Sequence, residues 1–175
     1  RTRAEARAAL QAAQRILGKL GVVLHTEKTR IVNVRYGIEF LGYKIKQGSH
    51  RLQVRPDKIR SNASSASLYA YPREKSIEHF KEQIRKRTRR KSPVSVEQLI
   101  DELNPVIRGW GNYYCKAPVR KLFNRLNRWI VRRIWSFKYK RWRNAGWKIL
   151  PAWKLYGEMG LVNLVSLIPS IGTCI

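Results

Sequence analysis

Apolar residues at helical spacing open the chain and return over its second half. Thr2 and Glu5 have the spacing of a capping box. The apolar residues that follow recur every three or four positions: Ala6, Leu10, Ala13, Leu17 and Leu20. This pattern predicts an amphipathic helix that ends at Gly21. After Pro72 the spacing is helical again, and it predicts three more helices, at residues 73–89, 95–114 and 118–143.

Short runs of β-forming residues lie between the first helix and Pro56. They are residues 22–24, 29–34, 38–45 and 51–55. Tight connections separate several of these runs, so we expect a small antiparallel meander. Residues 61–71, with clustered Ser and Ala, are typical of a loop or linker. The pattern therefore predicts an α+β fold, mostly α, in which a small antiparallel sheet precedes a three-helix bundle.

The predicted helix over residues 119–139 has two chemically different sides. Its cations Lys121, Arg125, Arg128 and Arg132 fall on one narrow stripe at 100° per residue. The apolar side chains Leu122, Leu126, Ile130 and Phe137 fall roughly opposite. We therefore expect one side to pack inward and the other to face a polyanion. Arg133 points into the apolar side, so it must snorkel, pair with a carboxylate, or reach a ligand through a gap.

The charge of the chain says more about its binding partner than about its fold. The 175 residues carry 37 Lys and Arg against 11 Asp and Glu, a formal net charge of +26. Such an excess favours nucleic acid as the partner. Every acidic residue except Glu158 precedes Leu103, whereas all six Trp follow it. Because disordered basic tails lack aromatic residues, this mixture favours a folded contact surface.

Cysteine usage and hydropathy indicate an intracellular protein, and we expect a bacterial cytoplasmic one. Cys115 and Cys174 are too few and too far apart for a disulfide framework or a zinc site. The apolar residues 161–175 are interrupted by Pro169 and Gly172 and are too short to cross a bilayer. We expect the tail from Lys154 onward either to pack on the helices or to occupy a surface that another domain normally covers.

Two segments carry a family resemblance. Residues 23–43, VLHTEKTRIVNVRYGIEFLGY, resemble the end of the palm domain of group II intron reverse transcriptases. Residues 103–114, LNPVIRGWGNYY, with the helix after them, resemble the maturase-specific thumb region of the same proteins. The resemblance divides the chain into a palm end at 1–56, a linker at 57–72, a helical thumb or maturase domain at 73–150, and a tail of unknown role at 151–175. It implies a protein that binds its own intron RNA, assists splicing, and copies RNA into DNA for intron mobility.

The resemblance also implies site residues. It places Lys28 in a loop near the polymerase site, where a lysine can act as a general acid for the leaving pyrophosphate; the alternative is a solvated lysine in a turn. It makes Phe40, Leu41, Gly42 and Tyr43 a primer grip, although Phe40 is equally expected in a strand that packs on a core. The residues expected to contact RNA are the stripe cations together with four others: Arg108, Trp110, Trp135 and Tyr139. Packing of Trp135 against the C-terminal segment is an equally good interpretation.

Polymerase activity is not expected from this chain alone. Two-metal nucleotidyl transfer needs converging carboxylates, and the only aspartates, Asp57 and Asp101, have no catalytic setting. Since the chain opens on Arg1, we expect it to be a piece of a longer protein that supplies fingers, most of the palm and Mg²⁺. The chain itself is expected to hold no metal or cofactor. A primer-extension assay with Mg²⁺ tests this expectation.

Three hypotheses about function stay open. The first is an RNA-binding fragment of a group II intron reverse transcriptase, with structured intron RNA and primer–template duplex as partners. The second is a basic nucleic-acid-binding structural module without a splicing role, which charge alone would allow. The third is a degenerate, truncated reading frame that performs no task. The oligomeric state is open in all three, and the edge of a small sheet could pair between copies.

Overall fold

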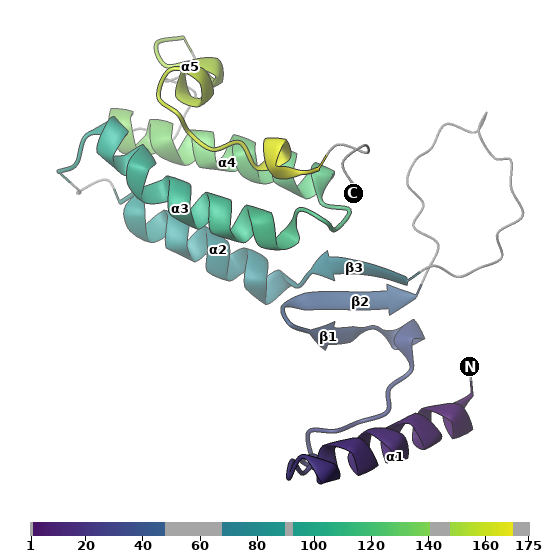
Figure 1. The fold of residues 1–175 in the computed structure, drawn as a ribbon. Helices are drawn as coiled ribbons and strands as arrows, with labels where there is room; N and C mark the ends of the chain where they lie inside the picture. The colour runs from purple at the N-terminus through teal and green to yellow at the C-terminus, as the bar shows by residue number, and fades with distance from the viewer. Residues whose placement is uncertain (1, 48–67, 90–92, 141–147, 170–175) are drawn as a thin grey trace, which may run out of the picture.

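A three-stranded sheet lies between an N-terminal helix and a group of packed helices (Figure 1). This computed structural model describes residues 2–47, 68–89, 93–140 and 148–169. The elements are α1 (Arg3–Lys19), η1 (Val34–Tyr36), β1 (Ile38–Phe40), β2 (Tyr43–Gln47), β3 (Leu68–Pro72), α2 (Glu74–Arg87), α3 (Val96–Tyr114), α4 (Arg120–Tyr139), α5 (Ala152–Gly157) and η3 (Leu164–Leu167). The predicted α+β class, mostly helical with a small antiparallel sheet, is confirmed.

The first helix begins where the capping box predicted it. The amide of Glu5 donates to Thr2 Oγ1 and the amide of Thr2 donates to Glu5 Oε2, each over 3.3 Å. None of the α1 residues is buried, and Ile16 on its apolar side is 61% exposed. The helix stands apart from the other elements (Figure 1), so its apolar side contacts water.

The predicted strands at residues 22–24 and 29–34 are wrong, because residues 22–33 form no strand and contain only a turn at 26–28, after which η1 begins at Val34. The run at 38–45 is not one strand but the hairpin of β1 and β2, paired with Phe40 opposite Tyr43. Leu41 and Gly42 form its two-residue turn, and both have a positive φ, 46° and 77°. Positive φ at both positions is what the turns favoured in two-residue hairpins require. The predicted strand at 51–55 lies outside the described residues.

The last five residues of the predicted linker form a strand. β3 pairs antiparallel with β2 from Leu68, opposite Gln47, to Pro72, opposite Tyr43. The order β1–β2–β3 makes β3 an edge strand. Proline is tolerated at the end of an edge strand, because a missing amide there costs no ladder hydrogen bond. The sheet therefore leads directly into α2.

Helices α2, α3 and α4 form the predicted bundle. Ser95 begins α3 with a second capping box, in which Gln98 is the reciprocal partner. α4 ends at Tyr139, four residues earlier than predicted, where Lys140 turns into a left-handed conformation with φ 55°. The core between the three helices consists of fully buried side chains: Phe80, Ile84, Leu99, Ile100, Leu103, Ile107, Phe123, Leu126, Ile130 and Ile134.

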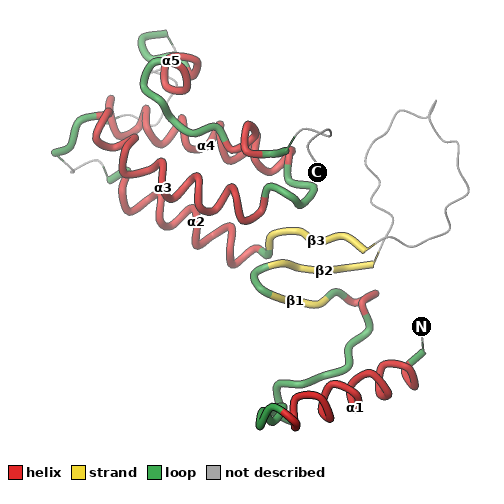
Figure 2. Tube along the Cα trace, in the orientation of Figure 1, coloured by secondary structure: helices red, strands yellow, loops and turns green. Residues whose placement is uncertain are grey.

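The C-terminal segment packs on α3 and α4, so the first of the two expectations for it is correct. It runs across these helices as α5 and η3 (Figure 2), and it buries three leucines: Leu155, Leu161 and Leu164. Amide side chains from both helices hold its backbone. Asn104 of α3 accepts from the Val162 amide at 2.9 Å, and Asn127 of α4 accepts from the Leu164 amide at 3.1 Å. The described part of the tail is thus packed on the three-helix bundle as part of the helical domain.

Gly111 of α3 lies directly under this segment. A Cβ atom there would be 2.5 Å from Leu167 Cδ1 and 2.8 Å from Leu164 Cδ2, whereas a Cβ at Gly109 meets nothing within 4 Å. Alanine gains about 1 kcal/mol over glycine inside a helix, but overpacking costs about 1–3 kcal/mol. We expect Gly109→Ala to raise the free energy of unfolding above that of the wild type. The free energy of unfolding of Gly111→Ala should be lower than that of Gly109→Ala by about 1–3 kcal/mol. Chemical denaturation of the two variants checks this, and equal stabilities would contradict the packed tail.

Candidate nucleic-acid interface

The four cations predicted to share one side of α4 do so. Lys121, Arg125, Arg128 and Arg132 are all exposed. The apolar residues predicted opposite them are buried: Leu122, Leu126, Ile130 and Phe137. We call the four cations the basic stripe. Among the described residues none of the four has a carboxylate partner, so their charge is available to a ligand.

The aromatic residues beside the basic stripe are half-buried. Trp135 Nε1 donates to the carbonyl of Leu150 over 2.8 Å, so the indole packs against the C-terminal segment, as the second interpretation proposed. The Tyr139 hydroxyl is buried and has no hydrogen-bond partner in the described part of the chain. Lys138 Nζ lies 5.7 Å from the centroid of the Tyr139 ring. Tyr139 is therefore not a free stacking platform, whereas Trp135, bonded through its Nε1 edge, also borders a cavity described below.

The two predicted contact residues on α3 differ in their surroundings. Arg108 is exposed. Trp110 is half-buried and stacks on Phe80, with ring centroids 4.5 Å apart and planes at 23°. Its ring also lies 4.7 Å from that of Tyr114 and 5.9 Å from that of Phe123. This geometry favours a packing role for Trp110 and leaves Arg108 as the contact candidate on α3.

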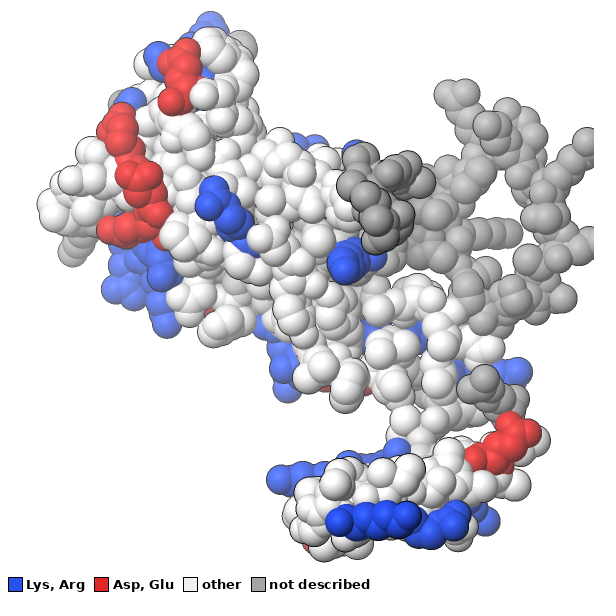
Figure 3. All heavy atoms as spheres, in the orientation of Figure 1, with Lys and Arg blue, Asp and Glu red and all other residues white. Residues whose placement is uncertain are grey.

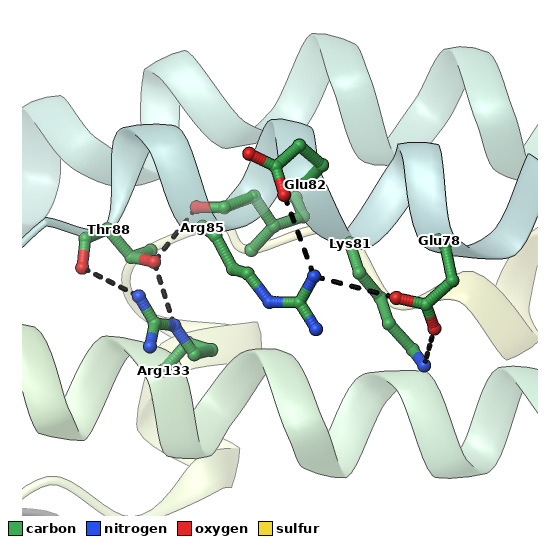
Figure 4. A network of polar contacts seen from close by, with 7 residues as sticks. Glu78, Lys81, Glu82, Arg85, Thr88 and Arg133 are labelled. Carbon is green, nitrogen blue, oxygen red and sulfur yellow. Dashed lines mark hydrogen bonds and ion pairs between the residues drawn. The ribbon is translucent and has the colours of Figure 1, made fainter.

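Arg133 has a partner that the sequence did not indicate. It donates from Nε to Thr88 Oγ1 at 3.0 Å and from Nη2 to the Thr88 carbonyl at 3.1 Å. Thr88 follows the last residue of α2 and is 1% exposed. Figure 4 shows the guanidinium reaching from α4 to this helix end, where a cation is stabilised by the unpaired carbonyl groups. Arg133 therefore joins α4 to α2.

The cations in the last turn of α2, Arg85, Lys86 and Arg87, form a second basic cluster, which is partly neutralised. Arg85 pairs with Glu78 at 3.5 Å and with Glu82 at 3.7 Å, and Lys81 donates to Glu78 at 2.6 Å (Figure 4). The Lys81 and Arg85 contacts hold the pKa of the Glu78 carboxyl below its usual value. Arg85 also lies over the Trp129 ring, 5.7 Å from its centroid. This cluster has less uncompensated charge than the basic stripe.

Charge is unevenly spread over the surface. On the face drawn in Figure 3 the packed helices are mostly uncharged, Lys and Arg line α1, and acidic side chains gather over the end of the bundle where α3 begins. The exposed carboxylates in that first half of α3 are Glu97, Asp101 and Glu102. An anionic ligand is therefore expected to avoid this end and to follow α4.

The predicted primer-grip residues form the joint between the sheet and the helices. Phe40 and Leu41 are 60% and 68% exposed. Tyr113 donates to the Leu41 carbonyl at 2.7 Å, and Tyr114 donates to the Gly42 carbonyl at 3.2 Å. Tyr43 donates to the Tyr113 carbonyl at 2.5 Å. The turn is thus fixed to the end of α3, and its two exposed apolar side chains project beyond it.

Gly42 is the most constrained position of this joint. Its φ is 77°, and a Cβ there would lie 2.6 Å from Tyr114 Oη. Gly37 has a similar φ of 82°, but a Cβ there would meet only ordinary contacts of 3.6 Å or more. We expect Gly42→Ala to lower the free energy of unfolding by about 2–4 kcal/mol and Gly37→Ala by about 1 kcal/mol, since both strain φ but only the first displaces a tyrosine. Thermal unfolding of the two variants measures the difference, and equal losses would show that the tyrosine contact contributes nothing.

Lys28 stays a prediction. It is exposed in a hydrogen-bonded turn, in which its amide donates to the His25 carbonyl over 3.2 Å. The neighbouring Thr29 amide donates to the same carbonyl over 3.0 Å. This position fits either a catalytic lysine near a polymerase site or a solvated turn residue.

A cavity that the sequence did not predict lies between α4 and the C-terminal segment. Its volume is about 900 Å³. It is lined by Asn124, Asn127, Arg128, Val131, Arg132, Trp135, Ala152, Tyr156 and Asn163. Arg128 and Arg132 therefore belong both to the basic stripe and to this cavity. Its second wall comes from the tail residues Ala152, Tyr156 and Asn163, which lie 17 or more positions after the last lining residue of α4, Trp135.

The described part of the chain has neither a cluster of metal ligands nor a helix that could span a membrane. Among its residues no group of three or more His, Cys, Asp or Glu side chains could hold a metal ion. No described helix has the length and apolarity needed to cross a bilayer. Cys115 is a half-buried free thiol.

Comparison with known families identifies the helical part of the chain. Residues 77–155 match the family described as group II intron, maturase-specific domain. This part of the chain is a group II intron maturase-specific domain. The matched segment of the maturase-specific domain runs from the first turn of α2 into α5, and it contains the whole of α3, α4 and the basic stripe. No curated protein matches the chain.

The match confirms the resemblance where it was most specific. The segment LNPVIRGWGNYY lies in the maturase-specific domain, as expected. The match does not reach α1 or the sheet, so their assignment to the end of a reverse transcriptase palm stays a prediction. The predicted start of the helical domain, residue 73, lies four residues before the match begins. The predicted division treated residues 151–175 as a separate tail, whereas the described part of that tail packs on the domain.

Proposed function

We propose that this maturase-specific domain binds structured group II intron RNA through the basic stripe of α4 and thereby assists splicing of the intron. The observation that carries the proposal is the exposure of four cations on one side of a helix whose other side is buried in the core of the domain. Cations fixed on a rigid helix contact phosphates without first losing the entropy of a disordered tail. The RNA partner is intracellular, in line with the expected location of the chain.

The remaining predicted residues extend this surface. Arg108 on α3 is a further exposed cation, whereas Arg85 of α2, although exposed, pairs with Glu78 and Glu82. In a longer protein that supplies fingers and palm, the same surface would also hold a primer–template duplex during RNA-templated DNA synthesis. The exposed Phe40 and Leu41 are the residues expected to contact the primer end there.

A competition experiment tests the proposal. Purified chain is titrated at physiological salt with labelled group II intron RNA, and unlabelled intron RNA or unrelated duplex RNA of equal length is added as competitor. We expect intron RNA to compete at least about tenfold better, since shape recognition adds to the charge term that both RNAs share. Equal competition would favour a basic structural module without a splicing role. Absence of binding to either RNA would contradict RNA binding altogether.

A further inference from the structure

The cavity between α4 and the C-terminal segment has the composition of a nucleotide site. We propose that it receives one unpaired nucleotide of a bound RNA, with the base inside the cavity and the phosphate at Arg128 and Arg132; this proposal rests on the RNA binding proposed above. The volume of about 900 Å³ lies within the range of small-molecule pockets, roughly 300–1,000 Å³, so the cavity is large enough for one nucleotide.

Two aromatic side chains border the space available to the base. Trp135 is held in place by its hydrogen bond to the Leu150 carbonyl, so its indole is already ordered before a ligand arrives. Tyr156 is half-buried, and burial raises its pKa to about 12, so the neutral hydroxyl keeps its proton at physiological pH. That hydroxyl has no hydrogen-bond partner among the described residues, so it can donate to a base or a ribose. Aromatic side chains stack on unpaired bases of any sequence.

The cations of the cavity suit a phosphate. Arg128 and Arg132 are one helical turn apart, both are exposed, and within the described structure neither forms an ion pair. Among the residues that the structure describes, the one hydrogen bond from these guanidinium groups is a long contact of 3.4 Å from Arg128 Nε to the Asn124 carbonyl. Since both residues also belong to the basic stripe, a strand whose phosphates follow α4 passes the mouth of the cavity. This continuity favours a nucleotide within an RNA over a free small molecule.

Of the three asparagine side chains that line the cavity, two are held by hydrogen bonds and one has no partner among the described residues. Asn127 donates to Asn163 Oδ1 at 2.6 Å, and these two side chains also hold the backbone of η3. Asn124 is exposed, and its amide has no partner in the described ranges. A free amide both donates and accepts, as the edge of a base requires. Asn124 is therefore the residue that contacts the base edge without supporting the fold.

The experiment compares two leucine variants of exposed asparagines. Asn124→Leu removes the free amide and fills part of the cavity, whereas Asn112→Leu makes the same change on α3 outside it; both retain every charge. Each is titrated with an RNA hairpin that has one 2-aminopurine in its loop and with a duplex of equal phosphate number in which the 2-aminopurine is paired. Fluorescence of the 2-aminopurine reports stacking, and anisotropy reports affinity.

We expect wild type and Asn112→Leu to quench the loop 2-aminopurine, and Asn124→Leu to lose the quenching and bind the hairpin about tenfold more weakly, with duplex affinity unchanged. Equal effects on hairpin and duplex, or no effect of Asn124→Leu, would overturn the cavity proposal while RNA binding stands. If the wild type bound neither RNA, the proposed RNA-binding function would be wrong, and the cavity proposal, which rests on it, would be wrong as well. Two competitors complete the test: displacement of the hairpin loop by adenosine monophosphate at equal concentration would reassign the cavity to free nucleotides, and displacement by an acidic peptide would reassign it to protein.

Discussion

A variant with alanine at Lys121, Arg125, Arg128 and Arg132 is expected to lose about 3 units from the slope of log affinity against log salt concentration for RNA binding. Each phosphate contact releases counterions and contributes roughly 0.7–0.9 to that slope, so four lost contacts remove about 3 units. The four side chains are exposed, and alanine is a strong helix former, so the fold should persist. Anisotropy titrations of structured RNA at several salt concentrations give the slope.

A charge-matched control variant separates the effect of the basic stripe from the effect of net charge. Alanine at Arg3, Arg7, Arg15 and Lys19 removes the same charge from exposed positions of α1. We expect this control to keep most of the slope, because α1 stands apart from the maturase-specific domain (Figure 1). If the two variants flattened the slope equally, the net charge of +26 rather than the basic stripe would account for binding.

Local signals made the helices predictable. Thr2 and Glu5 define the start of α1 by themselves, and the apolar spacing along α4 sorts its buried side from its cations within one element. Neither inference needs knowledge of what packs against the helix, because helical hydrogen bonds connect residues four positions apart. For the same reason the basic stripe could be found from the sequence with the right residues and the right orientation.

The sheet was less predictable because its bonds are not local. The runs at 22–24 and 29–34 have β-forming composition, yet no described strand pairs with them. β3, by contrast, lies in a stretch that looked like linker, and it becomes a strand by pairing Leu68 with Gln47 across more than 20 residues. Strand formation depends on such partners more than on intrinsic preference.

The parts of the interface that escaped the sequence also depend on distant partners. Arg133 binds Thr88, 45 positions earlier, so its apolar surroundings on α4 could not reveal the end of α2 as its partner. The cavity needs the tail, which Asn104 and Asn127 fix to the helices through bonds spanning 58 and 37 positions. Nothing in the apolar spacing of residues 151–169 indicates which helix face they cover.

Phe123→Ala is expected to lower the free energy of unfolding by about 3–5 kcal/mol, the usual loss when a fully buried phenylalanine is truncated. Phe123 is 0% exposed, and it lies in the first turn of α4 with its ring 5.9 Å from that of Trp110. The cavity left behind would border Trp110, whose stacking on Phe80 joins α2 to α3. Urea denaturation followed by circular dichroism measures the loss.

Trp153→Ala is the control for this variant, because Trp153 is 66% exposed and its truncation should change stability by no more than about 0.5 kcal/mol. The comparison also bears on function. Phe123 is on the buried side of α4, so its loss should weaken RNA binding only as the domain unfolds, whereas the stripe variant should bind poorly while fully folded. Retention of wild-type stability by Phe123→Ala would mean that α4 does not dock through its apolar side, and the orientation of the basic stripe would then lose its structural basis.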